Sequence, residues 1–294
     1  MSPRTRVVAV VAVVAAVAAG ATVGITLLQT RGESTGTTAR KGAPPLDLQV
    51  AGPLAKAVVL YNGGERARAG AIFSRYHSLE AEIGAAFSTW PHGSLDAVKK
   101  LVAASPGSAV AELHLGLAYY WSGRDADAAA AWKRAAAVEP DTPSAIAALD
   151  FLHPNVAPGL PPIVVDAGTI TPRARALLLK GIVLWDREHP LSAKRELDAA
   201  ATRAPHDPVV LVAAAMSTFT PAHPLRPFPK LGPLTAAFPN AAVVRLHLGV
   251  LLLWTRQVTK GKAQLRRAIA VQPGSVYASQ AKALLKALAG GGTR

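Results

Sequence analysis

The residue types that most often carry out chemistry give little support for catalysis in this chain. Its 294 residues include eight histidines and no cysteine, which excludes disulfides, thiolate metal sites and a thiol nucleophile. The histidines lack the HExxH spacing of zinc proteases, and no GxSxG, GxxxxGK[ST] or GxGxxG motif is present. Glu80, Glu82 and Glu112 form no carboxylate pair suited to acid–base catalysis. We therefore expect a protein that is not an enzyme and that uses no metal or cofactor.

Two of the histidines stand in matching sequence contexts. His114 precedes Leu115-Gly116, and His247 precedes Leu248-Gly249. This equivalence would place both histidines near a groove formed by repeated helices, and an internal repeat explains it without any bound metal ion.

A proline period indicates how that repeat is organised. Prolines at positions 106, 140, 205, 239 and 273 end helix-like runs, with spacings of 34, 65, 34 and 34 residues. Apolar residues at i, i+3, i+4 and i+7 predict two amphipathic helices in each unit, closed by the proline. Small residues in the paired helices allow close packing: Gly116, Gly181 and Gly249 in the first helix, and Ala128, Ala193 and Gly261 in the second.

These units resemble tetratricopeptide repeats. Ala109–Thr142 carries the family's Leu-Gly, Tyr119, Ala128, Trp132, Ala135 and Pro140 positions. The resemblance implies an all-α fold, a right-handed α-solenoid of helical hairpins over residues 54–288. The clear units are 109–142, 174–207 and 242–275, the degenerate units are 75–108 and 208–241, the irregular stretch is 143–173, the terminal cap helix is 276–288 and the tail is 289–294.

The N-terminal residues predict a membrane anchor. A short tail (1–6) precedes an uncharged, apolar stretch over 7–28, which as a helix would span about 33 Å. A cleaved signal peptide ending at Ala16-Val17-Ala18 is the alternative, and would make the protein secreted. Ala16, Gly20 and Gly24 form a small-residue ladder compatible with a homodimer, although an Ala-rich segment also gives this pattern by chance. Residues 29–53 are expected to be a linker, and the repeat domain to lie outside the cytoplasm.

The family resemblance also implies a binding surface. In tetratricopeptide repeats the first helix of each hairpin lines a concave groove that binds peptide segments of a partner protein. The groove residues carried over to this chain are Leu113, Leu117, Tyr120, Trp121, Leu178, Ile182, Trp185, Leu246, Val250, Leu253 and Trp254. An exposed apolar surface of this kind favours a partner-binding site. The alternative is that neighbouring repeats, or the Pro-rich inserts at 153–172 and 220–229, cover these side chains.

A second candidate surface is basic. Residues 208–294 contain eleven Lys and Arg and no acidic residue. Arg256, Lys260, Lys262, Arg266 and Arg267 form a predicted basic flank that would suit an anionic lipid or an envelope polymer, unless it is simply a solvated face. Nucleic acid is a weaker candidate, since basic and aromatic residues do not alternate. We expect a membrane-tethered scaffold, like the membrane-anchored bacterial members of the family, that assembles an envelope complex.

Overall fold

The structure is a computed structural model that describes residues 39–168 and 170–290. The predicted tail, the predicted anchor over 7–28 and the first part of the predicted linker lie outside these residues. Within the described ranges, no helix combines the length and the apolar character needed to cross a bilayer. All regular secondary structure described is α-helical, so the predicted all-α class is confirmed.

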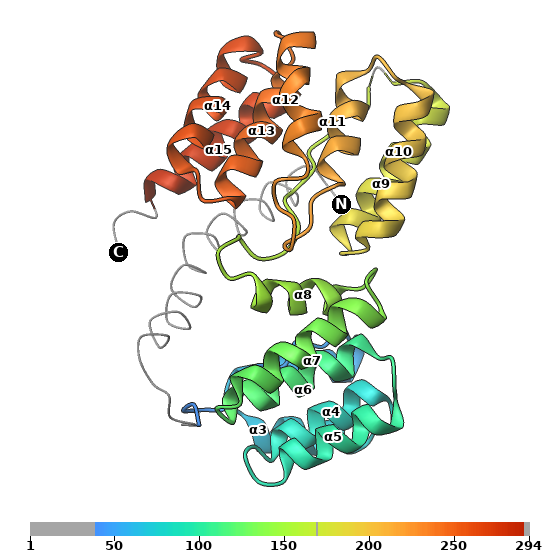
Figure 1. The fold of residues 1–294 in the computed structure, drawn as a ribbon, viewed down its shortest axis with the longest axis vertical. Coiled ribbons are helices and arrows are strands. Elements are labelled where there is room, and N and C mark those ends of the chain that lie inside the picture. The colour runs from blue at the N-terminus through green and yellow to red at the C-terminus, as the bar shows by residue number, and fades with distance from the viewer. Residues whose placement is uncertain (1–38, 169, 291–294) are drawn as a thin grey trace. The chain divides into compact units, whose positions relative to one another are not determined.

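The described chain forms two compact units, which meet in sequence between Leu152 and His153. The first unit contains α2 (Gly52–Asn62), α3 (Arg66–Phe73), α4 (Leu79–Ser88), α5 (Ser94–Ala104), α6 (Ala109–Trp121), α7 (Asp125–Val138) and α8 (Pro143–Leu152). Successive helices pack side by side as hairpins, and α8 packs on the last hairpin (Figure 1).

The second unit follows the same order. It contains α9 (Pro172–Asp186), α10 (Pro190–Arg203), α11 (Pro208–Met216), α12 (Phe228–Ala237), α13 (Ala242–Trp254), α14 (Val258–Val271) and α15 (Val276–Gly290). Its hairpins are α9–α10, α11–α12 and α13–α14, and α15 packs on the last of them (Figure 1). Each unit is therefore three hairpins and a closing helix.

Each unit also begins with a non-helical segment. We name residues 39–51 the first arm and residues 153–168 with 170–171 the second arm. Each arm contributes side chains to the apolar core of its own unit. The first arm includes most of the described part of the expected linker, and its residues pack because apolar side chains alternate along it.

Small residues let the paired helices approach closely. A Cβ on Gly116 would lie 2.2 Å from Trp132 Nε1, and one on Gly249 would lie 2.9 Å from Leu265 Cδ2. The second helices of these hairpins, α7 and α14, end at Val138 and Val271, two residues before Pro140 and Pro273, because proline disfavours helix in the residue before it. The stretch 143–173, expected to be irregular, instead divides into α8 and the second arm.

Candidate functional site

The first arm runs antiparallel to α6, and hydrogen bonds from α2 and α6 hold its main chain, three of which have equivalents in the second unit. The Arg40 N–H donates to the Trp121 carbonyl oxygen at 2.9 Å. The Tyr61 hydroxyl, from α2, donates to the Pro44 carbonyl oxygen at 2.8 Å. The Asp47 N–H donates to His114 Nε2 at 3.4 Å. The arm is therefore bound through its backbone by two helices of its unit.

The second arm is held by the equivalent groups of the second unit. The Ala157 N–H donates to the Trp254 carbonyl oxygen at 3.1 Å. Trp185 Nε1, from α9, donates to the Pro161 carbonyl oxygen at 2.8 Å. The Val164 N–H donates to His247 Nε2 at 2.9 Å.

The register of these contacts is the same in both units. Seven positions separate the two anchored N–H groups in each arm, and seven separate the Trp from the His in each helix. Both arms contain Gly-x-Pro-Pro-φ-x-φ, where φ is apolar, starting at Gly42 and at Gly159. Both of these glycines have positive φ, at 85° and 71°, a conformation that favours glycine. We infer that the two units are copies of one arm-and-groove design.

The tautomer of each buried histidine leaves its Nε2 free to accept a hydrogen bond from the arm. His114 Nδ1 lies 2.7 Å from the Val110 carbonyl oxygen, and His247 Nδ1 lies 2.7 Å from that of Val243. Since a carbonyl oxygen only accepts, Nδ1 carries the proton and a neutral ring leaves Nε2 as an acceptor. Burial lowers the pKa of His114, and it lowers the pKa of His247 to about 4, against the raising effect of the hydrogen bond to Val243. Both rings are therefore neutral at pH 7.

Apolar side chains of each arm fill the groove. Leu46 and Leu48 are 3% and 7% exposed, and Ile163 is 5% exposed. Pro44 and Pro161 are also buried. Buried and more exposed positions alternate between Pro44 and Gln49, so one side of the first arm faces the helices.

Most of the predicted groove residues are buried. Nine of them are buried: Leu113, Leu117, Leu178, Ile182, Trp185, Leu246, Val250, Leu253 and Trp254. Tyr120 and Trp121 are partly exposed. The structure thus covers the expected groove, and in the second unit part of the cover is the Pro-rich insert considered from sequence. Whether a partner contacts these side chains stays a prediction.

The two grooves differ in where their charged groups lie. In the first unit the charge is on the arm: the Arg40 guanidinium donates to both carboxylate oxygens of Asp125, at 2.8 and 3.1 Å, and lies 3.4 Å from the Tyr120 ring centroid. In the second unit it is on the helix side, where Arg256 donates to the Pro154 carbonyl oxygen at 2.8 Å. The first arm is therefore attached to its unit by the charged side chain of one of its own residues, Arg40.

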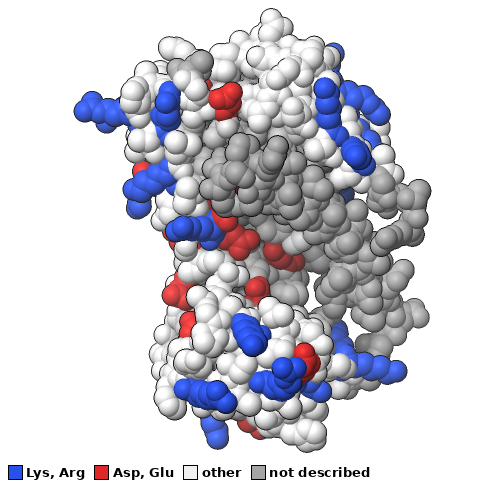
Figure 2. Space-filling view, turned by 180° about the vertical axis from the view of Figure 1, so that it is seen from behind, with Lys and Arg blue, Asp and Glu red and all other residues white. Residues whose placement is uncertain are grey.

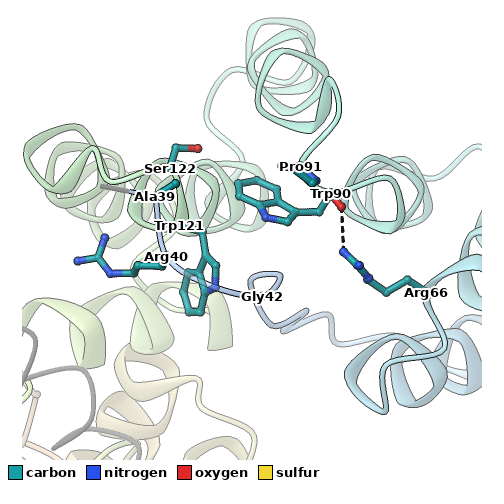
Figure 3. A pocket seen from close by; sticks show the side chains of 8 residues that line it. All are labelled: Ala39, Arg40, Gly42, Arg66, Trp90, Pro91, Trp121 and Ser122. Atoms are coloured by element: carbon teal, nitrogen blue, oxygen red, sulfur yellow. Dashed lines mark hydrogen bonds between the residues drawn. The ribbon is translucent and has the colours of Figure 1, made fainter. Parts of the chain in front are cut away.

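A small pocket marks the N-terminal start of the first arm. Figure 3 shows Trp90 and Trp121 beside it, with Ala39 close to Ser122. Arg66 closes another side and donates to the Trp90 carbonyl oxygen at 2.9 Å (Figure 3).

The predicted basic flank lies on the turn before α14 and on α14 itself. Arg256, Lys260, Arg266 and Arg267 are exposed and Lys262 is partly exposed. Two of these side chains contact neutral groups: Arg256 donates to the Pro154 carbonyl oxygen at 2.8 Å, and Lys260 Nζ donates to Gln257 Oε1 at 3.3 Å. On the face drawn in Figure 2, Lys and Arg occur in several separate groups and not in one continuous patch.

The search for a metal centre gives no candidate in the described residues. No group of three or more His, Asp or Glu side chains in residues 39–168 and 170–290 is placed to hold a metal ion.

Sequence reasoning missed the arms and their anchors, above all Pro44, Leu46, Tyr61 and Ile163. Their one sequence signal is the Gly-x-Pro-Pro-φ-x-φ pattern, which recurs at a spacing of 117 residues. A search for a 34-residue helical period does not detect it.

No family model matches the chain, and a comparison with curated proteins finds no match either. Among solved structures the chain is similar to YrrB, described as a TPR protein with an unusual peptide-binding site, at 16% identity and a TM-score of 0.31, over 78% of this chain and 90% of that one. It is similar to a tetratricopeptide repeat protein from Parabacteroides merdae at 12% identity and a TM-score of 0.30, over 79% and 83% of the two chains. It is also similar to the TPR2AB domain of yeast Sti1, solved as a complex with pHSP90, at 11% identity and a TM-score of 0.35, over 82% and 97%. At these identities and scores the likeness assigns no binding property to this chain.

Proposed function

We propose that this protein is a protein–protein interaction scaffold whose helical grooves bind non-helical peptide segments. The observation that carries the proposal is the repeated seat of the arms, with three equivalent main-chain hydrogen bonds in each unit. A surface that holds two different sequences through the same backbone groups has the geometry of a peptide-binding site.

Main-chain hydrogen bonds and buried side chains have different roles in the groove, and this difference supports the proposed function. Hydrogen bonds to the peptide main chain provide affinity that is independent of side-chain identity, whereas the buried apolar positions select the sequence. Asp47 and Val164 occupy the same position with different chemistry, and both N–H groups are bound. The selected features are therefore the prolines and the two apolar residues.

The partner segment we propose is non-helical and apolar, in place of the apolar peptide or helix expected from sequence. A helix satisfies its own N–H groups internally, so it offers no interior donors to the histidines. Of the predicted groove residues, Tyr120 and Trp121 are the partly exposed ones that a partner can reach while the first arm is in place.

The test uses a labelled peptide with the sequence of residues 39–50 and the full chain. The variant Leu46→Asp/Leu48→Asp weakens the seat of the chain's own first arm and should bind this peptide with micromolar affinity in fluorescence anisotropy. The control peptide carries Asp at the same two positions and should bind at least about tenfold more weakly, since two buried apolar side chains are lost. A folded variant that binds both peptides equally, or neither, contradicts the proposal.

We further propose that residues 7–28 tether the scaffold to a membrane, with the helical units outside the cytoplasm, for the assembly of an envelope complex. The support is the length and apolar character of this stretch. Protease digestion of intact cells, with and without permeabilisation of the outer barrier, tests the topology. Digestion of the helical units before the membrane is breached agrees with it, and protection until then refutes it. Recovery of a secreted protein shortened at its N-terminus would instead support signal cleavage.

A second candidate function is contact with an anionic lipid or envelope polymer through the basic flank. The observation that favours it is the exposure of four of the five flank residues in a stretch, 208–294, that contains no acidic residue. Binding to vesicles containing anionic lipid should then fall steeply between 50 and about 500 mM salt, because screening shortens the reach of exposed charges. Binding to the arm peptide should change little.

A further inference from the structure

We propose that Arg245 and Arg267, on the hairpin α13–α14, form a binding site for a carboxylate side chain carried by an acidic peptide of a partner protein. The proposal goes beyond the proposed function, because neither arginine is among the groups that hold the second arm. It also differs from contact through the basic flank, to which Arg245 does not belong. The site therefore stands or fails independently of the groove.

The hairpins of the two units place an ion pair and two arginines at the same positions. The bounds of α13 and α14 are those of α6 and α7 shifted by 133 residues. In the first unit, Arg134 Nε and Nη2 donate to the two carboxylate oxygens of Glu112 at 2.8 and 2.9 Å. At the same shift, Arg245 takes the place of Glu112 and Arg267 takes the place of Arg134. The second unit thus keeps the arginine and replaces its carboxylate with a second cation.

The loss of negative charge extends over the whole hairpin of the second unit. Residues 109–142 contain five acidic and three basic residues, whereas residues 242–275 contain six basic residues and no acidic one. Glu139 accepts the first N–H of α6 at 2.7 Å, and Gln272 accepts the matching N–H of α13 at 3.0 Å. The hairpin therefore keeps this hydrogen bond but not its charge, and it supplies no carboxylate for Arg245.

The guanidinium of Arg245 is weakly paired although it is partly buried. It donates from Nη1 to Gln264 Oε1 at 3.4 Å and from Nη2 to the Thr235 carbonyl oxygen at 3.3 Å, and both distances exceed the usual range of about 2.7–3.2 Å. Among the described residues, its buried Nε has no hydrogen-bond partner. Burial lowers the pKa of Arg245, and the positive charge of Arg267 lowers it further. A cation in this setting is stabilised by a bound anion.

The shape and position of the two arginines favour a carboxylate on a side chain over a lipid surface. A guanidinium presents its donors as a planar fork that matches a carboxylate, and Glu112 shows that a glutamate fits these positions in the first unit. Arg245 is only partly exposed, whereas Arg266 and Arg267 are exposed. A side chain can project between the helices to reach Arg245, but a flat bilayer surface meets the exposed arginines first.

The binding test uses the full chain and a labelled peptide of four glutamates flanked by glycines, measured by fluorescence anisotropy. The control peptide carries four glutamines. The glutamate peptide should bind at least about tenfold more tightly, because only its carboxylates form charge-assisted hydrogen bonds with guanidinium groups. Equal binding of the two peptides would overturn the proposal.

The matched control variant removes the same charge from a neighbouring exposed residue of α14. Arg245→Gln and Arg267→Gln should each weaken binding of the glutamate peptide at least about tenfold, whereas Arg266→Gln should weaken it less than about twofold. Arg267 is exposed, so its substitution tests the site even if Arg245→Gln fails to fold. Equal losses in Arg267→Gln and Arg266→Gln would assign the binding to net charge and overturn the site.

Charge reversal gives a second readout that needs no ligand. Arg245→Glu restores the pair of charges found in the first unit, so the carboxylate should pair with Arg267. The melting temperature should then rise by several degrees, and binding of the glutamate peptide should be lost. Arg266→Glu makes the same change in net charge and should raise the melting temperature less. An equal rise in the two variants would contradict the pairing of positions 245 and 267.

Vesicles containing phosphatidylglycerol distinguish the peptide from a lipid headgroup. Vesicle binding should respond equally to Arg245→Gln and Arg266→Gln, because a membrane surface contacts exposed charges without selecting one arginine. If Arg245→Gln alone abolishes vesicle binding, and the glutamate peptide binds no better than the glutamine peptide, the site takes a phosphate headgroup. That result would overturn the assignment to an acidic peptide.

Discussion

His114 and His247 link the seating of each arm to an ionisation state. Each ring is completely buried and uses Nε2 to accept the N–H of an arm residue. Protonation would convert that acceptor into a donor facing another donor, so a charged ring is incompatible with the seated arm. The arms are therefore held most firmly where both rings are neutral.

The stability of the second unit should consequently fall in mild acid. His247 has a folded-state pKa of about 4, below its unfolded value of about 6.5. Its contribution is fully present above pH 6.5 and is lost as the pH falls toward 4, because the unfolded chain binds the proton first. We expect the free energy of unfolding to drop by about 2 kcal/mol between pH 7 and pH 5 from this residue. Urea titrations at both pH values measure it. In the variant His247→Gln the drop should shrink, and an unchanged drop would assign the effect to other groups.

Gly116 sets the distance between α6 and α7. Its missing side chain leaves room for Trp132, whose Nε1 donates to the Leu113 carbonyl oxygen at 3.3 Å and whose ring stacks on Phe151 at 4.8 Å. Gly116→Ala forces this indole to move and should cost about 1–3 kcal/mol of stability. The control Gly232→Ala, in α12 with nothing within 4 Å of the added methyl group, should be neutral or stabilise by up to about 1 kcal/mol. Thermal unfolding of both variants tests the difference, and equal melting temperatures would disagree with this account.

At the scale of elements, the hairpins are more predictable than the arms. The helices α6–α7 and α13–α14 lie within residues 109–142 and 242–275, and α9–α10 begins two residues before the predicted unit 174–207. These hairpins follow the sequence pattern closely because apolar periodicity, small packing residues and closing prolines are all local signals. The arms carry no such period. Their position depends on contacts such as Asp47 to His114, 67 residues apart, which no local pattern reveals.

The same reasoning explains the outcome for the groove. Leu117 and Val250 lie in α6 and α13, the first helices of their hairpins, and both are buried, which is the alternative that the sequence left open beside an exposed groove. The sequence shows that His114 and His247 occupy equivalent positions in two repeats. Their role as hydrogen-bond acceptors follows only from the positions of the arms in the structure. The arms are thus the elements that the helical periodicity of the sequence does not predict.

The arms should show slow amide exchange although they contain no helix. The N–H groups of Asp47 and Val164 donate to completely buried histidines, so exchange requires the arm to leave the groove. We expect these two amides to exchange at least about a hundredfold more slowly than the amide of Gln49, which is an exposed residue. Hydrogen exchange followed by NMR resolves these amides, and equal rates would place the arms outside their grooves in solution.

At the scale of the whole molecule, each unit contains its own arm, hairpins, closing helix and core. The core of the first unit includes Leu46 and Leu48, and that of the second includes Ile163 and Ile170. Among the described residues, the core cluster of the first unit draws on positions 43–152 and that of the second unit on positions 156–288.

We therefore predict that residues 39–152 and 153–290 each fold when produced alone. Each should give a helical circular dichroism spectrum and one cooperative thermal transition. As a matched comparison, residues 52–152 lack the arm and should melt at least several degrees lower than residues 39–152. An unfolded longer fragment, or equal melting of the two, would contradict the role of the arm in the core.

The antiparallel course of the first arm along α6 also determines how the chain responds to mechanical load. A force applied to the N-terminal side of residue 39 reaches the bond between Arg40 and Trp121 first, then Pro44 and Tyr61, and only afterwards Asp47 and His114. Bonds loaded one after another open by peeling, at a lower force than bonds sheared together. Under tension the first arm would thus yield before any helix of the first unit, and the groove would open while its walls stay folded.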